Sequence, residues 1–201
     1  FMDNHSPAKQ TTFYAIGLSY KKADAEIRGK FSLEATAKTN LLEQAKTNGI
    51  ESLIVTSTCN RTEIYGFAQH PFQLIHLLCE NSLGTVEEFQ KYAYVYKQKE
   101  ALNHMFRVGT GLDSQILGDF EIIAQLKNAF VESKKHNLAN AYLERLVNSV
   151  IQASKKVKNE TEISSGATSV SFAAVQYIFK NVEAISNKNI LLFGTGKIGR
   201  N

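Results

Sequence analysis

The chain has 201 residues, of which 43% are hydrophobic, so it is long and apolar enough to bury a core in one domain or slightly more. Its formal net charge of +4 is too small to indicate a nucleic-acid-binding protein by itself. The absence of long apolar runs and of a signal-peptide pattern argues against a membrane span and predicts free cytoplasmic thiols at Cys59 and Cys79.

The first half of the chain predicts a sheet with two helices. Residues 1–11 are polar and irregular, and we treat them as a tail outside the fold. The residue pattern predicts strands and helices in the order 12–19 (strand), 32–48 (helix), 51–56 (strand), 62–68 (strand), 71–81 (helix) and 92–96 (strand). The order βαββαβ predicts an α+β domain with the ferredoxin-like fold, an antiparallel sheet with helices on one face.

After residue 96 the chain is expected to be helical. Apolar periodicity predicts helices over 100–108, 119–136 and 138–158, the second of them with Asp119 as its N-cap. The polar stretch that follows predicts a domain boundary near Glu160. A helix over 169–182 and an apolar strand over 189–193 then open a second unit. The expected domains are therefore 12–160 and 161–201.

Cys59 lies near the tip of the predicted hairpin, in the stretch TSTCNRTEIY. A thiolate is a strong nucleophile, and a turn with the polar neighbours Thr58, Asn60 and Arg61 is a suitable place to activate one. Arg61 would share a strand face with the thiol if the strand continued back through the turn. A cysteine that only fills space at the hairpin end is the alternative, and these residues alone leave both interpretations open.

Other polar residues have plainer interpretations. His76 and Cys79 share a predicted helix face, but two ligands do not make a zinc site, so core packing and no metal are expected. His104 could orient a substrate or move a proton, or it could simply lie on a polar helix face. The glycine-bearing loop 109–119 could bring backbone and hydroxyl groups to a ligand, or only connect two helices.

The last motif of the chain is rich in glycine. It consists of six residues with the spacing G-x-G-x-x-G directly after a predicted strand: Gly194, Thr195, Gly196, Lys197, Ile198 and Gly199. In that context the glycines permit a tight turn and the close approach of a pyrophosphate. The motif predicts the truncated start of a Rossmann-type α/β domain.

Five stretches in order resemble glutamyl-tRNA reductase. They are GLSYKKADAEIRGKFSL, STCNRTEIY, LNHMFRVGTGLDSQILGDFEIIAQ, ISSGATSVSFAAV and LLFGTGKIG, and they cover nearly the whole chain. The resemblance implies an oxidoreductase that reduces glutamyl-tRNA to glutamate-1-semialdehyde with NADPH, the first step of tetrapyrrole (porphyrin) biosynthesis. It implies a thioester intermediate on the cysteine of STCNRTEIY, because a thioester is more electrophilic than the ester it replaces.

The resemblance also assigns roles to residues of this chain. Cys59 and His104 would be catalytic, and NADPH would bind at 194–199. The substrate would be bound by Thr58, Asn60, Arg61, Ser114, Asp119, Glu121 and Gln125. Arg61 would hold the glutamate carboxylate, which its planar guanidinium matches. The family pattern G-E-x-Q-I reads Gly118-Asp119-Phe120-Glu121-Ile122 here.

The partners implied are glutamyl-tRNA(Glu), a second copy in a full-length homodimer, and the downstream glutamate-1-semialdehyde aminomutase, all in the cytoplasm. Because only the first domain is complete, this chain is expected to form or slowly hydrolyse the thioester without completing the reduction. A ferredoxin-like RNA-binding module without catalysis is the main alternative, although the aromatic signature of an RRM is absent. A cysteine hydrolase acting on small esters is another, and the glycine motif argues against it.

Overall fold

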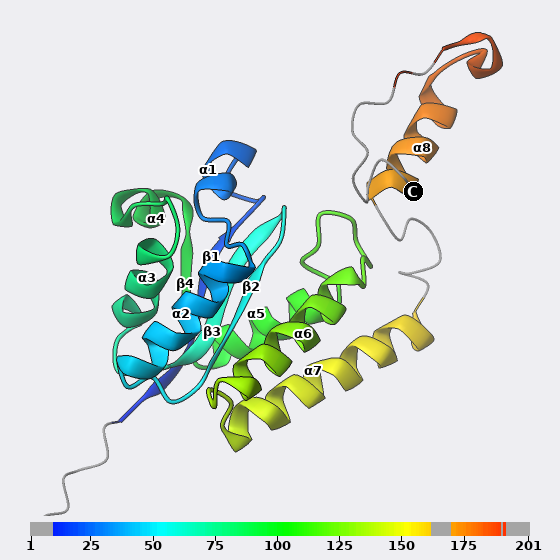
Figure 1. Ribbon diagram of the computed structural model, residues 1–201. Coiled ribbons are helices and arrows are strands. Elements are labelled where there is room, and N and C mark those ends of the chain that lie inside the picture. The colour runs from blue at the N-terminus through cyan, green and yellow to red at the C-terminus, as the bar shows by residue number, and fades with distance from the viewer. Residues whose placement is uncertain (1–9, 162–169, 190, 192–201) are drawn as a thin grey trace, which may run out of the picture.

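The fold is a four-stranded sheet surrounded by helices (Figure 1). A computed structural model describes residues 10–161, 170–189 and 191. The strands are β1 (Thr12–Ser19), β2 (Leu53–Ser57), β3 (Arg61–Ala68) and β4 (Tyr94–Lys97). The helices are α1 (Ala25–Lys30), α2 (Ala35–Thr47), α3 (Pro71–Glu80), α4 (Val86–Tyr92), α5 (Lys99–Gly109), α6 (Glu121–Lys135), α7 (Ala141–Glu160) and α8 (Val170–Asn181), followed by a 3-10 turn at Ile185–Asn187.

The sheet has the strand order β2-β3-β1-β4, and every neighbouring pair is antiparallel. The α+β class and the antiparallel sheet predicted from the sequence are therefore confirmed. The predicted helices of the βαββαβ unit, α2 and α3, both lie on one face of the sheet, and the helices that follow this unit, α5, α6 and α7, cover the other face. Neither face of the sheet is left open.

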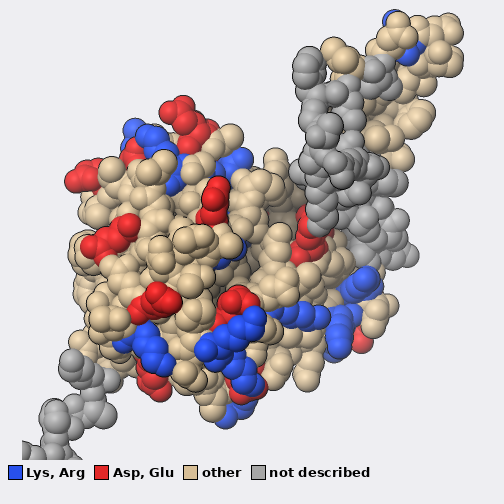
Figure 2. Space-filling model, in the orientation of Figure 1, with Lys and Arg blue, Asp and Glu red and all other residues tan. Residues whose placement is uncertain are grey.

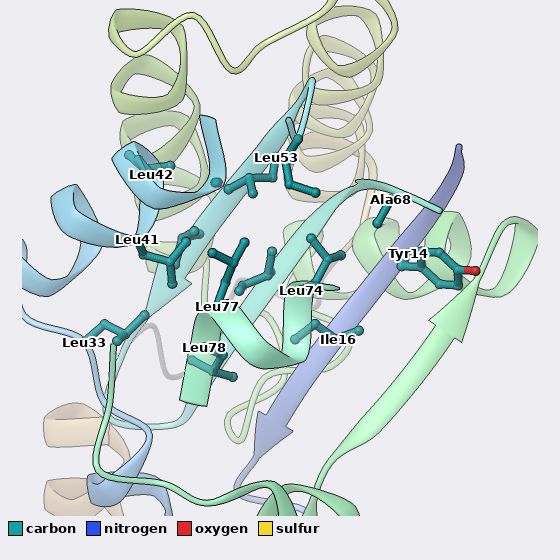
Figure 3. Close-up of a cluster of buried hydrophobic side chains, with 14 of the residues drawn as sticks. Tyr14, Ile16, Leu33, Leu41, Leu42, Leu53, Ala68, Leu74, Leu77 and Leu78 are labelled. Atoms are coloured by element: carbon teal, nitrogen blue, oxygen red, sulfur yellow. The ribbon is translucent and has the colours of Figure 1, made fainter. Parts of the chain in front are cut away.

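One face of the sheet packs on α2 and α3 (Figure 3). Alternate residues of β1, namely Tyr14, Ile16 and Leu18, point to this face, as the period of two in a strand requires. They meet a leucine-rich surface of the two helices, made by Leu41, Leu42, Leu74, Leu77 and Leu78. All of these side chains are buried, so this layer is an ordinary apolar core.

The opposite face is apolar at one end and polar at the other. Phe13 and Ala15 of β1, with Ile54 and Tyr65, pack on α5, α6 and α7. Further along the same face, β3 presents Arg61 and Glu63, which are also buried. Buried charges require partners inside the protein. This end of the sheet is therefore where a functional site is expected.

Several predicted element boundaries need correction. Two short helices, α1 and α4, were not expected from the sequence, and their N-caps are the side chains of Asp24 and Thr85. Asp119 is not the N-cap of α6, because Phe120 occupies that position. Asp119 instead accepts the N–H of Glu121 through Oδ1 at 3.0 Å. The predicted strand over 189–193 and the glycine motif at 194–199 lie almost wholly outside the described residues.

None of the helices in the described part of the chain is both long enough and apolar enough to cross a membrane. The longest, α7, is a 20-residue amphipathic helix with Leu143, Val147 and Val150 buried against its neighbours. Its apolar stripe is accounted for by packing within the domain.

Gly17 sits where β1 and β3 approach closely, directly opposite Glu63. A Cβ atom at this position would lie 2.2 Å from the backbone oxygen of Thr62 and 2.9 Å from the Glu63 Cα. We expect Gly17→Ala to lower the free energy of unfolding by about 1–3 kcal/mol, because the two strands must move apart. Gly29→Ala is the control, since a Cβ there meets nothing within 4 Å, and urea unfolding of both variants measures the difference. Equal stabilities would contradict the close approach.

Candidate active site

Cys59 lies in the tight turn between β2 and β3, as predicted, and it is exposed. Thr58 closes this turn: its N–H donates to the Arg61 carbonyl at 2.8 Å, and its Oγ1 accepts the N–H groups of Asn60 and Arg61 at 3.2 Å each. Arg28 Nε donates to the carbonyl oxygen of Cys59 at 2.9 Å. The backbone around Cys59 is therefore fixed by hydrogen bonds, while the residue itself faces solvent.

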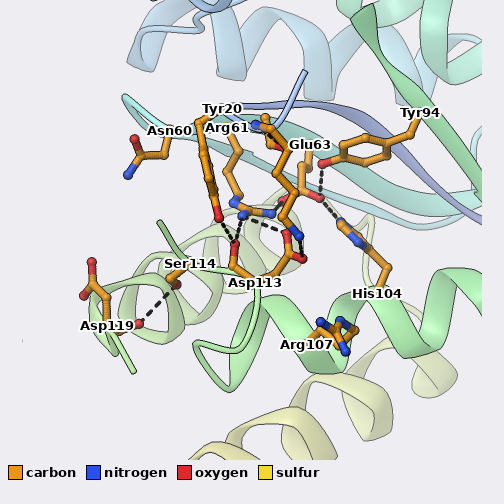
Figure 4. A network of polar contacts seen from close by, with 12 residues as sticks. Tyr20, Asn60, Arg61, Glu63, Tyr94, His104, Arg107, Asp113, Ser114 and Asp119 are labelled. Atoms are coloured by element: carbon orange, nitrogen blue, oxygen red, sulfur yellow. Dashed lines mark hydrogen bonds and ion pairs between the residues drawn. The ribbon is translucent and has the colours of Figure 1, made fainter. Parts of the chain in front are cut away.

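Arg61 is buried, with 3% of its surface exposed. Its Nη1 donates to Glu63 Oε1 at 3.1 Å, and its Nη2 donates to the backbone oxygen of Asp113 at 2.6 Å and to Asp113 Oδ2 at 3.0 Å (Figure 4). Burial by itself lowers the pKa of Arg61, but the negative charge of Glu63 raises it above its usual value. β3 begins at Arg61, so the strand does not run back through Cys59, and the condition under which the two side chains would share a strand face is not met.

Glu63 lies at the centre of a buried polar network and has no exposed surface. Its Oε2 accepts the hydroxyl of Tyr65 at 3.0 Å, the hydroxyl of Tyr94 at 2.7 Å and a hydrogen bond from His104 Nε2. Burial would raise the pKa of the Glu63 carboxyl, but the hydrogen bond from His104 and the charge of Arg61 outweigh it and lower the pKa to about 2. Glu63 is therefore an ionised acceptor at neutral pH.

His104 on α5 is held in one orientation by this network. Because an ionised carboxylate can only accept hydrogen bonds, the proton on the His104 ring that faces Glu63 belongs to Nε2. The ring centroid lies 4.9 Å from those of Tyr94 and Tyr96. The expectation of a histidine on a polar helix face is wrong, because His104 is buried.

Asp113 joins the loop after α5 to the network. It pairs with Arg61 and with Lys21, and its backbone oxygen accepts the Tyr20 hydroxyl at 3.3 Å. Burial raises the pKa of the Asp113 carboxyl, but the hydrogen bonds from Lys21 and Arg61 lower it below its usual value. The loop is thus anchored to β3 and is more than a connector.

The remaining predicted substrate residues are more scattered. Asn60 points away from the network in Figure 4. Ser114 Oγ is 3.5 Å from the backbone oxygen of Asp119, at the margin of a hydrogen bond. Glu121 is exposed at the start of α6. Gln125 lines a cavity between α2 and α6, which Ser57 of β2 also lines.

Five members of the network were not expected from the sequence: Lys21, Glu63, Tyr65, Tyr94 and Asp113. A local signal existed for two of them, because Glu63 and Tyr65 follow Arg61 at the spacing of two that places residues on one strand face. Tyr94 joins through the register of β4 with Gly17, and no local pattern contains that information. Within the described residues, no cluster of His, Cys, Asp or Glu could hold a metal ion.

Because Glu63 is ionised in the folded protein, the free energy of unfolding is expected to depend on pH in the acid range. Because its pKa is lowered from 4.5 to about 2 on folding, its contribution is fully present above pH 4.5 and is lost as the pH falls toward 2. We expect the free energy of unfolding to fall by roughly 3 kcal/mol over this range through this group. Glu63→Gln should flatten the profile, whereas the exposed Glu51→Gln should not, in urea titrations at successive pH values. If the unfolding free energy of Glu63→Gln depended on pH as steeply as that of the wild type, Glu63 would not be the source of the acid dependence.

Comparison with known proteins gives a consistent result. Residues 16–161 match the sequence model of the family "Glutamyl-tRNAGlu reductase, N-terminal domain". A protein named glutamyl-tRNA reductase from Flavobacterium psychrophilum is 77% identical over 200 residues, which cover 100% of this chain and 48% of that protein. Another of the same name, from Cytophaga hutchinsonii, is 38% identical over 94% of this chain and 46% of its own length.

A solved structure supports the same relationship. The glutamyl-tRNA reductase from Methanopyrus kandleri superposes with a TM-score of 0.67 and 25% sequence identity, covering 84% of this chain and 39% of that one. The chain therefore spans about half the length, or less, of the relatives it matches.

Proposed function

Because the chain belongs to the family of glutamyl-tRNA reductase N-terminal domains, we propose that it carries the acyl-transfer half of the reaction for which that family is named. The substrate is glutamyl-tRNA, in which glutamate is esterified to the terminal ribose. The Cys59 thiolate attacks the ester carbonyl, a C–S bond forms, and the bond between the carbonyl carbon and the ribose oxygen breaks. The tRNA leaves with a proton, and a glutamyl thioester remains on Cys59.

The single observation that carries this proposal is the Cys59 turn. Its backbone is held by Thr58 Oγ1, by the Thr58–Arg61 backbone bond and by Arg28, while Cys59 remains exposed. A nucleophile on a fixed backbone loses little conformational freedom when it attacks. A cysteine that only filled space would be buried.

His104 and Arg61 have supporting roles in this proposal. His104 donates Nε2–H to Glu63, so Nδ1 is the nitrogen that can accept a proton. In an oriented histidine base, one ring nitrogen is commonly fixed by a hydrogen bond while the other accepts the proton. Arg61 uses three N–H groups on Glu63 and Asp113 and has Nε–H and one Nη1–H left for the glutamate carboxylate. Thr58, Asn60, Ser114, Asp119 and Glu121 complete the proposed substrate pocket, together with Gln125, which lines a cavity that Ser57 also lines.

We further propose a division of the whole reaction between domains. Residues 12–160 form the catalytic domain, with the ferredoxin-like topology that the split order of its strands supports. Residues 161–201 begin a Rossmann-type domain, in which 194–199 would bind NADPH. NADPH supplies the hydride that converts the thioester to glutamate-1-semialdehyde. The cytoplasmic location, the homodimer and the aminomutase partner are proposed from family membership.

The alternative of an RNA-binding module without catalysis is disfavoured by the fold. An RRM binds bases on an exposed sheet face, whereas here the helices α5, α6 and α7 cover that face. Figure 2 also shows cations and anions interspersed over the surface in view, without a continuous basic stripe there. A hydrolase of small esters differs in one measurable respect, because it would accept glutamate esters that lack tRNA equally well.

Trapping of the acyl group tests the proposal. When the chain is incubated with labelled glutamyl-tRNA and quenched in acid, we expect a glutamyl adduct on the peptide containing Cys59 that hydroxylamine removes. Cys79 is the internal control, since this half-buried thiol on α3 should stay unmodified. Consumption of the ester without an adduct on Cys59, or an adduct on Cys79 instead, would overturn the mechanism.

A further inference from the structure

The surroundings of Cys59 must accommodate a negative charge during the proposed acyl transfer. When the sulfur adds to the ester carbonyl, a C–S bond forms and the π electrons of the C=O bond move to its oxygen, which gives a tetrahedral oxyanion. The oxyanion collapses as the bond to the ribose oxygen breaks, and that oxygen takes up the proton that the thiol released. Fixed N–H donors aimed at such an oxyanion are usually the largest single contribution to catalysis. Donors beside Cys59 that have no other acceptor are therefore of interest.

The turn between β2 and β3 leaves one backbone N–H unused. The N–H of Thr58 donates to the Arg61 carbonyl, and the N–H groups of Asn60 and Arg61 both donate to Thr58 Oγ1. The N–H of Cys59 donates to no acceptor within residues 10–161. Cys59 is exposed, and its N–H and its sulfur are close by covalent structure. This N–H is therefore the backbone donor available to an acyl group on the sulfur.

Arg28 of α1 brings a guanidinium group to the same place. α1 lies at the end of the sheet where the β2–β3 turn projects (Figure 1). Arg28 Nε donates to the Cys59 carbonyl at 2.9 Å, and Nη1 donates to the Ala23 carbonyl at 2.6 Å. Of the five N–H groups of an arginine, these bonds use two, so three have no acceptor in the described part of the chain. Arg28 is thus fixed beside the nucleophile with donors to spare.

The charge of Arg28 is also not neutralised by a carboxylate. Of the other two cations of the site, Lys21 pairs with Asp113, and Arg61 pairs with both Asp113 and Glu63. Arg28 forms no ion pair with any residue that the structure describes. A cationic donor stabilises an anionic oxygen more than a neutral donor does. Among these three cations, Arg28 is therefore the one whose charge remains available.

We propose that the Cys59 N–H and the Arg28 guanidinium form the oxyanion site of the acyl transfer, which makes Arg28 a further catalytic residue. Arg28 Nε holds the carbonyl of the residue that carries the nucleophile, and the unused N–H groups of Nη2 donate to the oxyanion as it forms. This role rests on the proposed function and adds to it the group that stabilises the intermediate. Because Arg28 is held at the residue that reacts, its effect is on the chemical step and not on the affinity for tRNA.

The rate of acylation in Arg28→Ala tests the proposal. With labelled glutamyl-tRNA under single-turnover conditions, we expect the maximal rate of Cys59 acylation to fall about a hundredfold, as for the loss of one oxyanion donor. The substrate concentration that gives half of this rate should stay nearly constant. Added guanidinium ion should restore part of the rate, because it can occupy the space that the side chain leaves. Lys22→Ala is the matched control, since Lys22 is an exposed cation of a neighbouring turn and should leave the rate unchanged.

Alkylation of Cys59 by iodoacetamide separates an oxyanion site from a structural effect. In this reaction the sulfur displaces iodide from a saturated carbon, so no oxyanion forms. We expect Arg28→Ala to alkylate Cys59 at the wild-type rate, measured by mass spectrometry of the peptide that contains it. If alkylation fell in parallel with acylation, Arg28 would act on the thiol or on the turn, and the proposed oxyanion site would be wrong.

The acylation assay also distinguishes this proposal from the proposed function. If wild-type Cys59 gained no glutamyl adduct, both would be overturned. If Arg28→Ala formed the adduct as fast as the wild type, the oxyanion site alone would be overturned. A variant with an unchanged maximal rate and a weakened affinity for glutamyl-tRNA would likewise overturn it, because Arg28 would then bind a phosphate of the tRNA.

Discussion

Cys59→Ser is expected to lower the rate at which the chain releases tRNA from glutamyl-tRNA by about a thousandfold or more. A serine hydroxyl is almost wholly protonated at neutral pH, and replacement of a nucleophile removes the covalent route altogether. The turn itself should survive, because its hydrogen bonds come from Thr58 and Arg28 and from backbone groups, and none uses the thiol. Rapid-quench measurement of released tRNA under single-turnover conditions gives the rate of the chemical step.

The second cysteine provides the control for this experiment. Cys79 packs half-buried against the apolar core under α3, and burial raises the pKa of its thiol, which keeps it protonated and unreactive. Cys79→Ser should therefore leave the rate of tRNA release unchanged. A wild-type rate of tRNA release in Cys59→Ser would exclude Cys59 as the nucleophile, because another group would then cleave the ester.

Glu63→Ala is expected to cause the largest loss of stability of any single substitution discussed. The change leaves the buried Arg61 guanidinium without one of its two carboxylates and removes the acceptor of Tyr65, Tyr94 and His104. Removal of one partner from a buried ion pair typically costs about 3–5 kcal/mol. The free energy of unfolding in urea, measured at neutral pH, checks the value.

An exposed ion pair provides the comparison for Glu63→Ala. Glu144 pairs with Lys134 at 3.0 Å, and the side chains are 44% and 61% exposed respectively. Glu144→Ala should leave the free energy of unfolding unchanged within error, because an exposed ion pair is hardly more stable than its two charges separately hydrated. If Glu63→Ala were as stable as Glu144→Ala, the network would not be an integral part of the fold.

Local pattern predicted most of the elements and the position of the candidate nucleophile. The richness of residues 12–19 in β-forming side chains located β1, and Cys59 was placed in a turn because two β-forming runs flank it at hairpin spacing. The short helices α1 and α4 were not predicted, because one or two helical turns contain too few residues to show a helical period of apolar residues. The roles of the site residues came from the resemblance to a family and remain predictions.

The sequence by itself determined the class of fold, the order of its strands and longer helices, and the turn that carries Cys59, because periodicity and turn chemistry depend on neighbours along the chain. Only the tertiary structure decided that both faces of the sheet are covered, that Glu63 joins Arg61 to His104, and that Gln125 and Ser57 line one cavity. These facts depend on strand register and on how helices distant in sequence pack. Burial of a charge depends on partners that approach through space, and Glu63, Tyr94 and His104 are brought together by three different elements.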